Sequence, residues 1–237
     1  MKPAKVYVIP SLLGDGDFER VIPVYNLQIL RELNHFAVEN EKSARRFIKQ
    51  ILPEKKQSEL QIEILNKHSK DEDIQPLLQL LYQGNSVGII SEAGMPGIAD
   101  PGAKLVEAAH SNGYQVIPLC GPSSIFLALA ASGFNGQSFS FHGYLPIDKR
   151  ERKIAIQQLE MKSKSANSTE IFMETPYRNH ALIEDLLQNL SHSTRLCIAC
   201  DLTLNSEFVF AASIKEWKNQ KLDFHKRPAI FLIQADY

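Results

Sequence analysis

Residues 91–102 read Ser91-Glu92-Ala93-Gly94-Met95-Pro96-Gly97-Ile98-Ala99-Asp100-Pro101-Gly102. The apolar run before them, within residues 86–91, is typical of a strand that is buried on both faces of a parallel sheet. A helical pattern over residues 103–111 follows. Glycines let a backbone approach a ligand closely and prolines stiffen a loop. The segment therefore predicts a rigid ligand-binding loop, since an ordinary turn needs only a few residues.

The rest of the chain repeats this alternation of short β-branched runs and helical patterns, which is typical of βα units. Strands are expected over residues 6–9, 35–39, 61–65, 86–91, 114–119, 138–145, 170–174, 195–202, 207–212 and 229–235. Helices are expected over 21–33, 42–51, 77–82, 103–111, 122–132, 148–162 and 177–190, with Asp148 as a cap and a loop over 163–168. We predict an α/β protein of two domains, residues 1–120 with a mostly parallel sheet and residues 121–237 with a mixed one.

Composition narrows the class of partner. The 26 basic and 27 acidic residues leave a net charge of -1, so no global positive field favours nucleic acid; DNA is not expected, and any RNA contact needs a local patch. Three cysteines are too few for a disulfide scaffold and indicate a reducing compartment. Cys197 and Cys200 match C-x-x-C, but within a strand we expect buried core residues.

Several common binding and catalytic motifs are absent from the sequence. The chain lacks G-x-G-x-x-G after its first strand, G-x-x-x-x-G-K-[ST], G-x-S-x-G and H-E-x-x-H, which argues against nicotinamide, P-loop and hydrolase chemistry. The seven histidines are scattered, so no metal site is expected. The first apolar run is interrupted by Pro10 and is too short for a membrane span, and a cytoplasmic protein is expected.

Two further turns place polar groups where a strand becomes a helix. One covers residues 119–124, Leu119-Cys120-Gly121-Pro122-Ser123-Ser124, and the other covers 172–178, Phe172-Met173-Glu174-Thr175-Pro176-Tyr177-Arg178. Free amides and hydroxyls at a helix start can bind a ligand, but they can equally serve as helix caps. Both interpretations remain open from the residues alone.

In their order and spacing, these three turns resemble the tetrapyrrole methylase superfamily. Within it the chain is most similar to the branch that methylates the ribose 2'-hydroxyl of a cytidine in small-subunit ribosomal RNA. Ser132-Gly133-Phe134 and Phe141-His142-Gly143-Tyr144-Leu145-Pro146 extend the resemblance, which covers essentially the full length.

The resemblance implies that S-adenosylmethionine binds in a cleft between two α/β domains, usually in a homodimer. The cofactor-binding positions that it implies are Pro10, Ala93, Gly94, Met95, Ile98, Ser123, Ser124, Phe172, Met173, Glu174, Pro228 and Ala229. A side chain at Gly94 would be expected to take the ligand's place. The apolar helix over 124–131 must be buried by the core, a partner or both.

Methyl transfer from a sulfonium mainly requires alignment and exclusion of water, and a hydroxyl acceptor also needs a proton acceptor or a nearby cation. Glu174, Asp201 and Glu207 are the candidates for the proton acceptor, and each could instead be surface charge or a helix cap. Lys149, Arg150, Arg152 and Lys153 could contact phosphates, or form a solvated helix face.

Some positions depart from the ribosomal RNA branch. Cys200-Asp201-Leu202-Thr203-Leu204 replaces a motif that normally begins with Arg-Glu and ends with Lys, and Glu39-Asn40-Glu41-Lys42 stands where Asp-Thr-Arg is usual. Neither Cys200 nor Leu204 can stabilise charge that develops during transfer, so another basic residue such as Arg178 would have to act. The alternatives are a methyltransferase for a small or tetrapyrrole-like molecule, and a cofactor-binding paralogue that has lost catalysis.

Overall fold

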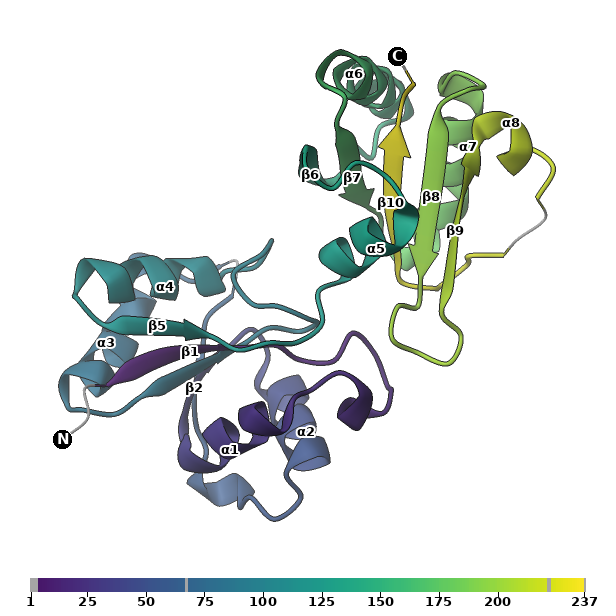
Figure 1. The fold of residues 1–237 in the computed structure, drawn as a ribbon. Helices are drawn as coiled ribbons and strands as arrows, with labels where there is room; N and C mark the ends of the chain where they lie inside the picture. The colour runs from purple at the N-terminus through teal and green to yellow at the C-terminus, as the bar shows by residue number, and fades with distance from the viewer. Residues whose placement is uncertain (1–3, 67, 221–222, 237) are drawn as a thin grey trace. The chain divides into compact units, whose positions relative to one another are not determined.

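The chain forms two compact units, Met1–Ser123 (unit 1) and Ser124–Tyr237 (unit 2). The structure, a computed structural model, describes residues 4–66, 68–220 and 223–236. Each unit has its own five-stranded sheet flanked by helices (Figure 1). None of the helices in the described part of the chain has the length and apolarity that spanning a bilayer requires.

Unit 1 is built on a fully parallel sheet with the strand order β3-β2-β4-β1-β5. Its strands are β1 (Lys5–Ile9), β2 (His35–Val38), β3 (Gln61–Ile64), β4 (Val87–Ile90) and β5 (Gln115–Pro118). All four residues of the central strand β4 are buried, as expected for a strand that is covered on both faces. The predicted parallel sheet is confirmed.

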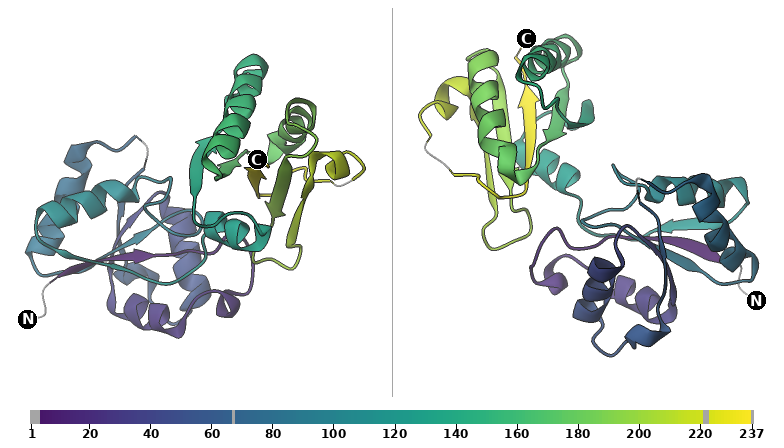
Figure 2. Two further views of the ribbon diagram at one scale, coloured as in Figure 1. Left: turned by 45° about the horizontal axis from the view of Figure 1, so that its top comes forward. Right: turned by 180° about the vertical axis from the view of Figure 1, so that it is seen from behind.

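Helices cover both faces of this sheet (Figures 1 and 2). Two core clusters show the pairing: one joins the strands to α1 (Val24–Glu32) and α2 (Glu41–Ile51), the other joins them to α3 (Gln75–Tyr82) and α4 (Gly102–Ser111). Short 3-10 turns complete the unit: η1 (Phe18–Arg20), η2 (Gln57–Glu59) and η3 (Asp71–Ile74).

The register of unit 1 brings its candidate loops to one edge. Ile9 and Val38 both pair with Ile90, and Val8 pairs with Pro118. Because all the strands run the same way, the segments that follow β1, β2, β4 and β5 leave the sheet at its carboxyl edge. Ligands of open parallel sheets bind at such an edge.

Unit 2 has the strand order β6-β7-β10-β8-β9, in which only β6 and β7 are parallel. Its strands are β6 (Phe139–Tyr144), β7 (Thr169–Met173), β8 (Arg195–Cys200), β9 (Phe208–Ser213) and β10 (Ala229–Gln234). The mixed sheet expected for the second half is thereby confirmed.

The main core of unit 2 lies under three helices, α6 (Lys149–Ala166), α7 (Asn179–Asn189) and α8 (Ile214–Trp217). The helix α5 (Ser124–Ser132) packs on β8, β9 and β10 across the sheet from α7 (Figures 1 and 2). A 3-10 turn, η4 (Pro176–Arg178), leads into α7.

One prediction was wrong: residues 163–166 continue α6, and no loop begins at Ser163. Ser163 is fully buried, donates a hydrogen bond to the carbonyl of Ser168 at 2.6 Å and accepts one from the amide of Ala235 at 2.9 Å. These contacts override the preference of small polar residues for loops, and the helix ends only where Asn167 turns left-handed. Asp148 caps the helix as predicted, because its Oδ1 accepts from the amides of Arg150 and Glu151.

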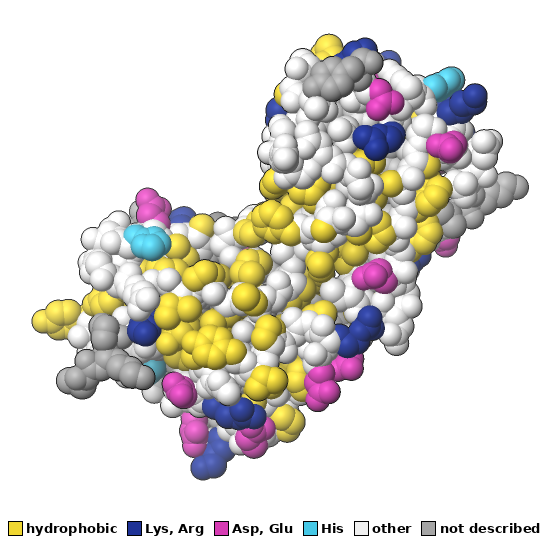
Figure 3. Space-filling view, viewed as in Figure 1, with side chains coloured by type: hydrophobic (Ala, Val, Ile, Leu, Met, Phe, Trp, Pro, Cys, Tyr) yellow, Lys and Arg dark blue, Asp and Glu magenta, His cyan; other side chains and the backbone are white. Residues whose placement is uncertain are grey.

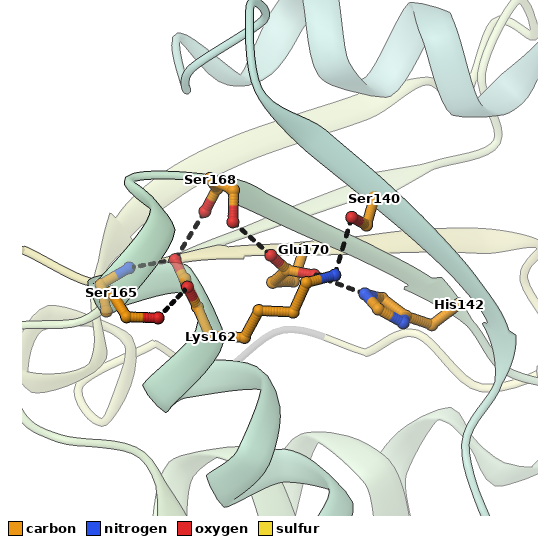
Figure 4. A network of polar contacts seen from close by, with 8 residues as sticks. Ser140, His142, Lys162, Ser165, Ser168 and Glu170 are labelled. Atoms are coloured by element: carbon orange, nitrogen blue, oxygen red, sulfur yellow. Dashed lines mark hydrogen bonds and ion pairs between the residues drawn. The ribbon is translucent and has the colours of Figure 1, made fainter.

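A buried carboxylate fastens α6 to the β6–β7 edge (Figure 4). Glu170 is fully buried and accepts hydrogen bonds from Ser168 Oγ and from Lys162 Nζ at 3.1 Å, while His142 Nε2 lies 2.5 Å from its Oε2. Burial alone raises the pKa of Glu170, but these hydrogen bonds outweigh burial and lower that pKa below its ordinary value. The network is therefore built for an ionised carboxylate.

Replacing this carboxylate tests the network. Because the pKa of Glu170 falls on folding, its stabilisation is complete above the pKa of the unfolded side chain, about 4.3, and is lost as pH falls through the lower folded value. Glu170→Gln should lower the free energy of unfolding at pH 7 by about 2 kcal/mol. It should also weaken the acid dependence of stability below about pH 4.3.

Denaturant titrations between pH 3 and pH 7 would measure both effects. Glu184→Gln, which removes an exposed carboxylate on α7, serves as the matched control, with an expected change below about 0.5 kcal/mol. Equal losses in the two variants would show that the network does not stabilise unit 2.

Candidate functional site

The carbonyl of Gly94 ties together two loops at the carboxyl edge of unit 1. It accepts hydrogen bonds from the amide of Ser11 and from Ser91 Oγ, both at 3.0 Å. Gly94 has a φ of +72°, which favours glycine. The loop after β4 is thereby fixed to the loop after β1.

A second contact fixes the loop after β5. A Cβ on Gly121 would lie 2.2 Å from Cγ of Pro10, so only glycine lets the proline ring pack here. Asn26 of α1 is buried and donates from Nδ2 to the carbonyl of Cys120 at 2.8 Å. The loops after β1, β4 and β5 are therefore held by specific contacts.

Asp100 stiffens the loop after β4 from within. Its Oδ2 accepts the amide of Gly97 at 2.8 Å and its Oδ1 accepts the amide of Gly102 at 2.7 Å. Burial raises the pKa of Asp100, although the two amides act in the opposite direction. Between these anchors, Ala99 has a φ of +62°, a strained value for a residue with a side chain.

The predicted cofactor residues of unit 1 all lie on these fixed loops. Pro10 and Gly94 are buried, Met95 and Ser123 are half-buried, and Ala93 and Ile98 are exposed. Ser11 Oγ is buried and has no hydrogen-bond partner among the described residues. A cleft of about 110 Å³ opens beside the loops, lined by residues 11–15, 43–44, 46–47, 50 and 90–92. Ser11 lines this cleft, whereas none of the six predicted residues does. The exposed Ile98, the backbone of the loops and the Ser11 hydroxyl are the kinds of group that contact a nucleoside such as that of S-adenosylmethionine.

The candidate residues of unit 2 also share one edge of a sheet. Strand β10 lies between β7 and β8, with Ile230 beside Met173 and Ala229 beside Cys200. Glu174 and Asp201, which follow β7 and β8, are therefore separated by the start of β10, about 10 Å for two strand spacings. Phe172 is fully buried and stacks on Phe231 with ring centroids 6.0 Å apart, so only its backbone can reach a ligand.

Glu174 differs from the other two candidate carboxylates in the hydrogen bonding of its two oxygens. Its Oε1 accepts the amide of Thr175 at 2.6 Å and forms an ion pair with Arg178 Nη2 at 2.5 Å. Its Oε2 is buried and has no hydrogen-bond partner among the described residues. A buried carboxylate oxygen without a partner is costly, and a ligand that donates a hydrogen bond would remove that cost.

Asp201 and Glu207 instead brace the loop between β8 and β9. Asp201 Oδ2 accepts from Arg227 Nε at 2.8 Å and from Ser206 Oγ at 2.9 Å. Glu207 Oε2 accepts the amide of Thr203 at 2.7 Å. Both Asp201 and Thr203 have left-handed backbones, with φ of +50° and +73°, and these hydrogen bonds hold the strained loop.

Two basic residues play structural parts. Arg152, one of the predicted phosphate contacts, is 6% exposed and bonds Asp185 through Nε at 2.7 Å, so it cannot reach a phosphate and that interpretation was wrong. Arg178 is bound to Glu174, and this contact raises the pKa of Arg178.

Cys197 and Cys200 are buried, as predicted, and burial raises the pKa of the Cys200 thiol to about 11.

Residues 5–218 match the profile of the family described as "Tetrapyrrole (Corrin/Porphyrin) Methylases". The chain belongs to this family. Membership confirms the expected class, a methyltransferase that uses S-adenosylmethionine as its methyl donor. Among the described residues no group of three or more His, Cys, Asp or Glu side chains is arranged to hold a metal ion.

Several curated relatives carry one name, Ribosomal RNA small subunit methyltransferase I. The chain is 30% identical to the protein of Vibrio cholerae over 212 residues, which cover 89% of this chain and 69% of the relative. It is 37% identical to that of Thermotoga maritima over 64% of this chain and 65% of the relative, and 34% identical to that of Halalkalibacterium halodurans over 64% and 50%. The alignments thus span between half and about two thirds of these relatives.

Solved structures confirm the fold. Diphthine synthase superimposes with a TM-score of 0.66 at 15% identity, over 98% of this chain and 90% of that one. The methyltransferase CobJ superimposes with a TM-score of 0.62 at 16% identity, over 98% and 94%. At these identities the similarity shows the shared fold alone.

Sequence reasoning missed three residues that shape the site: Asn26, Arg227 and Ser11. Asn26 acts from the first turn of α1, where no local pattern distinguishes it from a surface asparagine. Arg227 meets Asp201 only because β10 lies beside β8. Ser11 could have been found, since it lies two residues after a predicted buried strand.

Gly94 offers a direct test of the loop, although not for the reason expected from the sequence. A Cβ at Gly94 would meet Leu13 Cδ2 at 2.9 Å and the carbonyl oxygen of Pro122 at 3.1 Å, so it would push the loops apart. Gly94→Ala should weaken binding of S-adenosylhomocysteine by at least about tenfold, since a shift of about 1.4 kcal/mol suffices. Calorimetric titration measures this directly.

The control is Gly113→Ala. Gly113 has a similar φ of +74° but open space around its Cβ position, so this variant carries the backbone strain alone. It should lose comparable stability and keep its affinity. Equal affinities in both variants would show that the loop after β4 does not bind the cofactor.

Proposed function

We propose that this chain transfers a methyl group from S-adenosylmethionine to the ribose 2'-hydroxyl of a cytidine in small-subunit ribosomal RNA. The fixed glycine and proline loops of unit 1 carry the methyltransferase part of this proposal, because they fit the donor that the family uses. The shared name of the relatives supports RNA as the acceptor.

When bound, S-adenosylmethionine supplies a methyl group on a positively charged sulfur, which is already a strong electrophile. The part of the protein is to align the two reactants and to exclude water. Residues 91–102 and 119–123 would hold the donor through backbone groups. Their internal hydrogen bonds mean that little ordering is needed on binding.

Glu174 is the residue that would act on the acceptor. Its Oε2 has no partner in the part of the chain that the structure describes, so it can accept a hydrogen bond or a proton from a ribose hydroxyl. Arg178 and the amide of Thr175 fix the other oxygen and thereby the direction of Oε2. Asp201 and Glu207 would position the neighbouring loop.

Contacts with RNA would have to be local. On the face drawn in Figure 3, Lys and Arg side chains alternate with Asp and Glu side chains and form no continuous basic surface. Lys149, Arg150 and Lys153 are exposed on α6 and remain candidates for phosphate contacts. A small acceptor molecule would need none of them.

Single-turnover methylation of small ribosomal subunits, from a strain that lacks the protein, tests the proposal. The wild-type chain should transfer methyl from labelled S-adenosylmethionine to one cytidine ribose, located by mass spectrometry. Glu174→Gln should lower the rate by about a hundredfold while it leaves affinity for S-adenosylhomocysteine unchanged. Glu207→Gln should lower it by less than about tenfold.

Absence of transfer by a wild-type protein that binds the cofactor would favour a small-molecule acceptor or a paralogue without catalysis. Equal loss in the Glu174 and Glu207 variants would remove the distinction between the two carboxylates.

We also infer a homodimer in the cytoplasm. On α5, Phe126 and Leu127 are 50% and 38% exposed although the helix is apolar, and Phe126 meets the edge-strand residue Phe139 with ring centroids 6.1 Å apart. A second copy could cover these side chains. Light scattering at micromolar concentration should give the mass of a dimer, and Phe126→Asp should shift it toward a monomer. A wild-type monomer would contradict the inference.

A further inference from the structure

Tyr177 is the exposed aromatic residue closest in sequence to the candidate proton acceptor. It lies in η4, three residues after Glu174, and is 72% exposed. Nothing in the methyl transfer proposed above uses its ring. Exposure alone does not mark a ligand site, since Tyr82 is 81% exposed as well, but the contacts around Tyr177 set it apart.

Two segments that are distant in sequence are locked together around this ring. The amide of Lys226 donates to the carbonyl of Pro176 at 3.1 Å. Asn179, fully buried, donates from Nδ2 to the carbonyls of Phe224 at 3.0 Å and Arg227 at 2.7 Å. The turn before α7 and the approach to β10 therefore form one fixed surface.

Lys226 is held in a strained conformation that places its charge over the ring. Its φ is +60°, and its Nζ lies 5.7 Å from the centroid of Tyr177. The ring of His225 meets Tyr177 edge-on, with centroids 6.3 Å apart and an interplanar angle of 81°. Strain of this kind persists where the surrounding contacts enforce it, and it concentrates at ligand sites.

The cationic side chains around Tyr177 differ in whether they have an acidic partner. Arg178 and Arg227 are engaged by Glu174 and Asp201. His180 is engaged by Asp223, with Nε2 and Oδ1 2.8 Å apart. Within the described part of the chain Lys226 forms no ion pair, so its ammonium can still attract an anion.

We propose that Tyr177 and Lys226 form a platform for one unpaired nucleotide of the acceptor RNA, with the base stacked on the face of the tyrosine ring away from Lys226 and a flanking phosphate at Lys226. Every base has a flat π-face, and single-stranded RNA is commonly bound by aromatic stacking combined with cations. The inference rests on the proposed RNA-methylating function and deepens it.

The location of the platform gives it a role in positioning. Tyr177 lies between Glu174 and Arg178 in the chain, and Lys226 precedes the Arg227 that binds Asp201. A base stacked on Tyr177 would anchor the RNA strand at the same edge of unit 2 as Glu174. Tyr177 would thus position the acceptor.

Steady-state methylation of small ribosomal subunits by the full chain tests the platform. Tyr177→Ala should raise KM for the subunit by at least about tenfold, because stacking contributes about 1 to 3 kcal/mol per base. Tyr177→Phe should retain most of the affinity. Lys226→Asn should raise KM and make it less sensitive to salt, since asparagine tolerates the left-handed backbone but carries no charge.

The matched control is Tyr82→Ala on α3, which removes a tyrosine that is 81% exposed in unit 1, and it should leave KM unchanged. Binding of S-adenosylhomocysteine should be equal in all variants. If the wild type methylates the subunit but Tyr177→Ala behaves like Tyr82→Ala, the platform is refuted while the proposed function stands. Loss of cofactor binding in Tyr177→Ala would likewise overturn it and assign the ring to the donor site. No methylation by wild type would refute the RNA acceptor itself.

Discussion

The close approach of Pro10 and Gly121 is the constraint on which the edge of unit 1 depends. The ring occupies space that any Cβ at position 121 would take, and the neighbouring Ser11 then donates to the carbonyl of Gly94. These contacts bind the ends of β1, β4 and β5 into one surface. Because the loops are already ordered, a ligand there need not supply the free energy of ordering them.

In unit 2, side-chain ion pairs hold the segments that follow β7 and β8. Strand β10 separates β7 from β8, so the Glu174–Arg178 and Asp201–Arg227 pairs lie on the two sides of its start. Asp201 is bound by Arg227 and Ser206, whereas Oε2 of Glu174 has no hydrogen-bond partner among the described residues. Under the proposed function, backbone groups of unit 1 would bind the donor and a carboxylate of unit 2 would act on the acceptor.

Sequence patterns predicted most of the fold because buried parallel strands and glycine-ended helices leave local signals. They failed at residues 163–166, where contacts of Ser163 with the distant Ala235 extend a helix that local preference would end. The sequence located the candidate loops. It could not predict the contacts that hold them in place, since Asn26 and Arg227 contact residues that are distant in sequence. Likewise, Arg152 lies in a basic stretch of the sequence, and only the fold shows that it is bound to Asp185.

Hydrogen–deuterium exchange of the full chain, with and without saturating S-adenosylhomocysteine, tests most directly whether the fixed edge of unit 1 binds the donor. We expect slower exchange at the amides of residues 93–95, 97–98, 121 and 123–124, with no change around the turn at Gly113. Unchanged exchange in both loops under saturating ligand, with protection elsewhere in the chain, would contradict it.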